Sequence, residues 1–203
     1  MVFDPNDRTN DYLPSDLFAD GVNVSLAANW TGTVFGRTSS LGLTGTYSSK
    51  EGVDLQDVLL PPGLEAGTRK GSYNVAISGS HLFWESDLHP GRGLGAYFRA
   101  AIADGNPNPI RSSVVGGLAG YGVVPNRPDD VFGIGFYHYN FSKDLRFSLA
   151  PQLEIGDETG IETFYNFEVT PWLRLTADLQ WVRPVNSNLR DTWAGGIRAS
   201  INF

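Results

Sequence analysis

The feature that most constrains the fold is an alternation of apolar and polar side chains between residues 160 and 181. Odd positions, such as Ile161, Phe167 and Leu175, are mainly apolar, whereas even positions, such as Glu162 and Arg174, are mainly polar. A period of two is typical of strands with one apolar and one polar face. The segment therefore predicts two β-strands and excludes a helix.

A tight turn at residues 170–172 is expected to join these strands in an antiparallel pair. A three-residue turn predicts these facing pairs: Val169 with Leu173, Phe167 with Leu175, Ile161 with Trp181, Glu168 with Arg174, and Glu162 with Gln180. A final strand over 191–203 continues the pattern, with Trp193 near Trp181 and Arg198 opposite Thr176. Each pair keeps apolar and polar residues on separate faces.

The same reading predicts nine strands in the whole chain. They cover residues 20–30, 34–48, 72–84, 92–104, 111–123, 130–141, 160–170, 173–181 and 191–203. Most are long enough for tilted strands that cross a bilayer, which need about 9–11 residues. Longer loops (4–19, 49–71, 103–111, 142–159, 184–190) alternate with shorter turns (31–33, 85–91, 124–129, 170–172), as in outer-membrane barrels. We expect local structure in 142–159 and a short helix in 54–60.

Composition excludes several other classes. The net charge of −7 argues against a nucleic-acid partner. The absence of cysteine excludes disulfides and thiolate metal sites. No run reaches the roughly 18 apolar residues of a membrane helix. An all-β chain whose strands carry one apolar face remains.

The two ends suggest a segment of a larger membrane protein. The start has no secretory signal, so we expect a removed signal or a longer chain, and Val2-Phe3 reads as the tail of a preceding strand. The last strand ends at Phe203, like the terminal signal of bacterial outer-membrane barrels, and predicts the barrel-assembly machinery as a partner.

The runs VVPNRPDDVFGIGFYHYNFS (123–142) and DETGIETFYNFEVTPWLRLTADLQWVRP (157–184) resemble the carbohydrate-selective porins of the OprB type. FADGVNVSL and SYNVAISGSH look similar too. The resemblance implies an antiparallel transmembrane β-barrel of about 16 strands in the bacterial outer membrane. Residues 1–203 would form its C-terminal part, about nine strands of a single barrel domain. The implied function is passive diffusion of small sugars or other small polar solutes, without reaction chemistry or cofactor.

Polar-face positions form the candidate pore lining. A diffusion pore needs hydrated polar groups, and sugars also suit aromatic faces. The candidate set is Tyr97, Arg99, Glu162, Phe164, Asn166, Glu168, Arg174, Asp178, Gln180 and Arg198. Each residue could equally be an ordinary wall residue, and Glu168 with Arg174 could be a structural pair. Trp30, Tyr47, Trp172, Trp181 and Trp193 fall near strand ends, where they would contact the lipid interface.

Catalytic and metal motifs are weak. His81, His89 and His138 lack metal-ligand spacing, and neighbouring Ser80 and His81 would point to opposite strand faces. Asp129 and Asp130 read as solvated turn carboxylates. Three alternatives stay open: a small complete outer-membrane barrel with a structural or adhesion role, an outer-membrane enzyme, and a soluble ligand-binding β-barrel.

Overall fold

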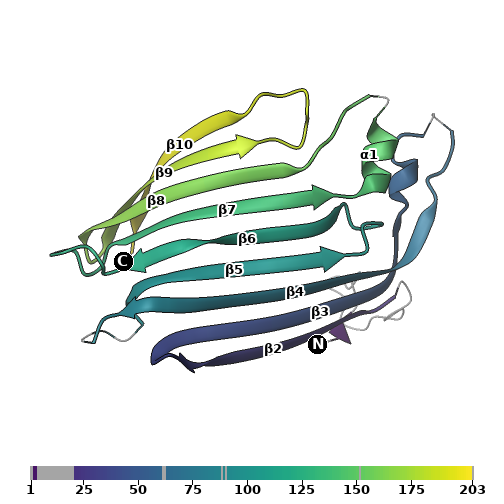
Figure 1. Cartoon of the computed structure of the whole chain (residues 1–203). Helices are drawn as coiled ribbons and strands as arrows, with labels where there is room; N and C mark the ends of the chain where they lie inside the picture. The colour runs from purple at the N-terminus through teal and green to yellow at the C-terminus, as the bar shows by residue number, and fades with distance from the viewer. Residues whose placement is uncertain are drawn as a thin grey trace.

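The computed structural model describes residues 2–3, 21–60, 63–87, 89, 91–150 and 152–202. In this part of the chain the strands form one antiparallel sheet, ordered as in the sequence (Figure 1). They are β1 (Val2–Phe3), β2 (Asn23–Val34), β3 (Arg37–Val53), β4 (Thr68–Glu85), β5 (Gly93–Ala103), β6 (Ile110–Tyr121), β7 (Val131–Phe141), β8 (Glu158–Thr170), β9 (Leu173–Arg183) and β10 (Thr192–Ile201). The sheet is open, because β10 pairs with β9 alone among these strands.

The nine predicted strands correspond to β2–β10, and the all-β class is confirmed. Val2 and Phe3 form β1, opposite Val24 and Asn23. The predicted first turn at 31–33 was wrong. β2 runs on to Val34, and the turn lies at Phe35 and Gly36, whose φ values are 52° and 72°. A two-residue hairpin turn needs two residues with left-handed φ angles, and Phe35 and Gly36 supply them. The β-branched residues Thr31 and Thr33 favour a strand instead.

The register of β8 and β9 follows the sequence prediction at four of the five predicted pairs. Phe167 faces Leu175, Glu168 faces Arg174, Ile161 faces Trp181 and Glu162 faces Gln180. The fifth pair was wrong, because Thr170, not Val169, faces Leu173. The turn holds only residues 171–172, and an irregularity between Glu168 and Thr170 absorbs the extra residue. In β10, Arg198 faces Thr176 and Trp193 faces Trp181, as expected.

The expected alternation of long and short connections holds only in part. The two longest, 54–67 and 142–157, lie at one end of the sheet (the long-loop end), but the connection 104–109 at that end is shorter than 122–130 at the other. The loop predicted at 49–71 is shorter than expected, because β3 and β4 extend the hairpin into it. Both expected local structures are present, as the 3₁₀ helix η1 (Leu55–Asp57) and the helix α1 (Lys143–Leu149). They contact each other at the long-loop end (Figure 1). The loop predicted at 4–19 and the terminal Phe203 lie outside the described residues. No described helix has the length and apolar character to cross a bilayer.

The sheet has one apolar and one polar face, and neither packs on a second layer of strands. Among the described residues, the buried apolar side chains are Leu55, Ala76, Ala103 and Ile155. In contrast, the apolar face exposes large side chains on almost every strand, including Leu26 (74% exposed) and Ile197 (85% exposed). An apolar surface of this extent needs an apolar environment of its own.

Candidate functional site

The polar face of the sheet is the candidate site. Cross-strand partners share a face, and the register forms one continuous row from Tyr97 through Gly117, Gly135 and Glu162 to Gln180. Because alternate residues of a strand share a face, the structure places the whole candidate set on this side. It comprises Tyr97, Arg99, Glu162, Phe164, Asn166, Glu168, Arg174, Asp178, Gln180 and Arg198.

A hollow of about 390 Å³ lies over β8, β9 and β10 on this face. It brings together an aromatic ring (Phe164), a carboxylate (Asp178) and a guanidinium (Arg198). The rest of its lining is Val131, Glu162, Asn166 and Thr176. Among the described residues, neither Asp178 nor Arg198 has an ion-pair partner. Both charges are therefore available to a solute.

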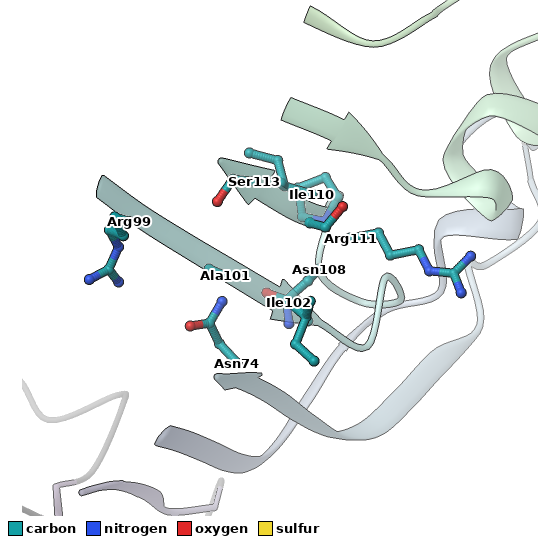
Figure 2. A pocket seen from close by; sticks show the side chains of 11 residues that line it. Asn74, Arg99, Ala101, Ile102, Asn108, Ile110, Arg111 and Ser113 are labelled. Carbon is teal, nitrogen blue, oxygen red and sulfur yellow. The ribbon is translucent and has the colours of Figure 1, made fainter. Parts of the chain in front are cut away.

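A second hollow, of about 270 Å³, lies over β4, β5 and β6 near the long loops (Figure 2). Asn74 and Arg99 line it from the strands, and Asn108 lines it from the loop between β5 and β6. In Figure 2 the side chain of Arg111 extends away from Arg99. Of the candidate residues, Arg99 lines this hollow, and Glu162, Phe164, Asn166, Asp178 and Arg198 line the other. The lining residues of these two hollows do not include Tyr97, Glu168, Arg174 or Gln180.

Arg174 differs from Arg198 because its side chain is held by the protein. It forms an ion pair with Glu168, and its Nη1 donates to the carbonyl of Asp129 (3.0 Å) and to Asn166 Oδ1 (3.2 Å). These partners hold the guanidinium group of Arg174 against the sheet. The geometry favours the structural interpretation of the Glu168–Arg174 pair.

The turn between β6 and β7 is anchored by Asp130, which is only 2% exposed, so the interpretation of this residue as a solvated carboxylate was wrong. Arg127 binds it with two hydrogen bonds of 2.8 Å, and Tyr165 and the Glu168 N–H also donate to it. Burial raises the pKa of Asp130, but these hydrogen bonds outweigh burial and lower the pKa to about 2. The turn is thereby fixed beside Arg174.

The long loops are joined by the buried side chain of Asn106. Its amide group donates to Asp54 Oδ1 (2.7 Å) and Asp144 Oδ2 (2.9 Å), and its carbonyl accepts from the Leu55 N–H. The hydrogen bond from Asn106 is the main reason that the pKa of Asp54 falls to about 2. This network ties η1 to α1 and holds the loops next to the hollow that Arg99 lines.

Sequence reasoning missed the small residues of the polar face. Gly117 and Gly135 lie in the row beside Tyr97, and a side chain at either position would meet the Tyr97 hydroxyl. Asn74 and Asn108, which line the hollow near the long loops, were also missed. Asn74 carried a usable signal, because it occupies an even position in a strand whose odd positions are apolar.

The histidines in β4 and β7 have ordinary partners within the sheet. His81 Nδ1 is 2.8 Å from Ser39 Oγ, and His138 Nδ1 is 2.9 Å from Thr159 Oγ1. His81 contacts Ser39 rather than its neighbour Ser80, whose hydroxyl contacts Ser40. In the described part of the chain, no group of three or more His, Asp or Glu residues could hold a metal ion.

Comparison with curated proteins gave no match. Among solved structures, the chain is similar to the high-pH structure of Pseudomonas putida OprB, with a TM-score of 0.80 and 19% identity. The match covers 91% of this chain and 49% of that chain, so this chain spans about half its length. At this identity the likeness establishes the fold.

The family follows from the sequence itself. The model of the carbohydrate-selective porin family, OprB, matches residues 4–203, which is nearly the whole chain. The resemblance stated from the sequence is therefore confirmed, over residues 4–203. The chain belongs to the carbohydrate-selective porin family, OprB.

Proposed function

We propose that this chain forms part of an outer-membrane β-barrel through which small sugars diffuse passively along the polar face. The observation that carries the proposal is the division of the sheet into an exposed apolar face and a hollowed polar face. An apolar face of this kind suits lipid tails, and a polar face suits a hydrated channel. Membership of a porin family supports a channel rather than an enzyme.

The residues of the polar face suit neutral polar solutes. Arg99 and Arg198 supply cations, Glu162 and Asp178 supply carboxylates, and Phe164 supplies a ring face beside them. A wall with both charges offers donors and acceptors to sugar hydroxyls without the strong ion selectivity of a single-sign ring. The carbohydrate-selective family supports sugars as the solute class.

The open sheet supports the proposal that residues 1–203 are the C-terminal part of a single larger barrel. The solved porin is about twice as long as the matched region, and β2 and β10 leave edges that further strands would cover. We further propose the bacterial outer membrane as the location. The expected partners are its lipids and, through β10 and the C-terminal residues that follow it, the barrel-assembly machinery.

The proposal is tested by conductance in planar bilayers. We expect the intact barrel that contains residues 1–203 to form water-filled channels whose ionic current falls as a small sugar is added, because bound sugar obstructs the ions. Proteoliposomes should swell faster in a pentose or hexose than in a trisaccharide. The absence of channels and of sugar-driven swelling would contradict the proposal.

Arg198 and Arg174 are expected to differ in ion selectivity. Replacing Arg198 by glutamine removes a cation that no described residue neutralises, so the reversal potential in a salt gradient should shift toward cation selectivity. Replacing Arg174, which is paired with Glu168, should change the reversal potential less and lower stability more. Equal shifts would remove Arg198 from the proposed pore lining.

A further inference from the structure

The side chain of Tyr97 lies over two glycines on the polar face. Tyr97 of β5 faces Gly117 of β6, which in turn faces Gly135 of β7. A Cβ atom added at Gly135 would lie 2.7 Å from the Tyr97 hydroxyl, and one added at Gly117 would lie 3.0 Å from it. The side chain of Tyr97 therefore leans across β6 and reaches β7 along the polar face.

The row continues beyond the Tyr97 hydroxyl to an acidic residue. Glu162 of β8 faces Gly135, so it is the next residue in the row beyond the Tyr97 hydroxyl. Neighbouring strands lie about 4.8 Å apart, which places Glu162 beside the ring. Both Tyr97 and Glu162 are exposed, and the Tyr97 hydroxyl has no hydrogen-bond partner among the described residues.

Other rings also cover glycines, yet they differ from Tyr97. Phe164 lies over Gly133 and Tyr137 lies over Gly160, and both glycines are buried beneath them. The Tyr137 hydroxyl is already used, since it donates to Glu158 Oε1 at 3.1 Å. Covering the backbone is therefore a sufficient role for Tyr137, whereas Phe164 also lines the hollow over β8, β9 and β10. Tyr97 remains 41% exposed and keeps a free hydroxyl.

We propose that Tyr97, which leans along the polar face over Gly117 and Gly135, is a stacking platform for the pyranose ring of a sugar, with Glu162 accepting a sugar hydroxyl beside it. The inference rests on the proposed function and names a contact site within it. The C–H face of a pyranose is apolar and packs on the face of an aromatic ring. The carboxylate beside the ring accepts the equatorial hydroxyls that project from the sugar's edge.

The first test removes the ring. Tyr97→Leu keeps an apolar side chain but loses the flat face, whereas Tyr97→Phe keeps the face. With glucose as the probe, we expect the sugar concentration for half-block of the current to rise about two- to tenfold in Tyr97→Leu. Tyr97→Phe should stay within about twofold of the unmodified protein. An unchanged half-block in Tyr97→Leu would overturn the platform.

The second test displaces the ring without changing it. Gly135→Ala brings a methyl group against the Tyr97 hydroxyl at 2.7 Å, while its next neighbours are no closer than 3.5 Å. The Tyr97 side chain must shift to relieve this contact, so we expect single-channel conductance to change and glucose block to weaken. Adding Tyr97→Phe removes the clashing oxygen, because the ring carbon Cζ lies 3.8 Å from the methyl position. The double variant should recover both properties.

Gly45→Ala on the apolar face is the control for adding a methyl group to the sheet, since a Cβ at Gly45 meets nothing within 4 Å. Recovery in the double variant with a silent control supports the platform, and a Gly135→Ala channel like the unmodified one overturns it. Failure of the proposed function is separate, because it shows as the absence of any channel. In that case the platform is tested by saturation-transfer NMR of glucose with the detergent-solubilised protein. Equal saturation transfer to glucose from the unmodified protein and from Tyr97→Leu overturns the platform.

Discussion

Arginine at Leu179 is expected to prevent most of the protein from inserting into lipid, whereas arginine at the next residue, Gln180, is expected to be tolerated. Leu179 lies on the apolar face, is 45% exposed and stands near the middle of β9. Gln180 lies on the polar face, opposite Glu162. A lipid-facing arginine at the bilayer midplane costs about 2–4 kcal/mol, while a channel-facing arginine stays hydrated.

The comparison is decisive because both variants add one arginine to β9, and they differ in the face of the sheet on which the arginine lies. The folded fraction after insertion into vesicles, measured by heat-modifiable migration on gels and by protease protection, reports the difference. Ile197→Arg on β10 should behave like Leu179→Arg, since Ile197 also lies on the apolar face. Equal insertion of Leu179→Arg and Gln180→Arg would show that the faces do not divide lipid from water.

The second large effect concerns Asp130. Replacement by asparagine is expected to lower the free energy of unfolding by about 3 kcal/mol, because Arg127 then loses its buried counter-charge. The Tyr165 hydroxyl and the Glu168 N–H also lose a charged acceptor. Denaturant titration of the vesicle-inserted protein, followed by tryptophan fluorescence, measures the change.

Glu51→Gln provides the control for the loss of a carboxylate. Glu51 forms an ion pair with Lys70 at the solvent-exposed long-loop end, and such exposed pairs contribute little. We expect no measurable change in this variant. An Asp130→Asn protein as stable as the Glu51→Gln protein would contradict the anchoring role of the turn.

The contribution of Asp130 should depend on pH in a defined direction. Its pKa falls from the ordinary 3.8 to about 2 in the folded protein. The folded state therefore binds protons less readily, so this stabilisation is fully present above about pH 4 and is lost as the pH falls toward 2. The loss of stability between pH 4 and pH 2 should be smaller in Asp130→Asn than in the unmodified protein.

The strands could be predicted because apolar and polar residues alternate along nearly all of them. The contrast between odd and even residues in 160–181 was strong enough to predict the register of β8, β9 and β10. In β6 and β7, glycines such as Gly117 and Gly135 weaken this contrast, so the strands were found but their faces were not. The residues at which strands end were the least predictable, as at Phe35, where the turn depends on left-handed φ angles.

The site could be predicted only as a face. Alternation placed the ten candidate residues on one side, but it carries no information about which charge is neutralised by a loop. The sequence predicted Glu168 opposite Arg174 and Thr176 opposite Arg198, but only the fold shows that the Asp129 carbonyl also binds Arg174. Asp130 was misjudged for the same reason, because its partners Tyr165 and Glu168 come from a different hairpin.

The strands are ordered in the sheet as they are in the chain, and this order affects how the number of strands can change during evolution. Every strand from β2 to β9 pairs only with the strands before and after it in the chain. Duplication or deletion of one hairpin therefore leaves all remaining partnerships and their up–down alternation unchanged. Ancestral lineages could widen or narrow the aperture two strands at a time, without inventing a new topology.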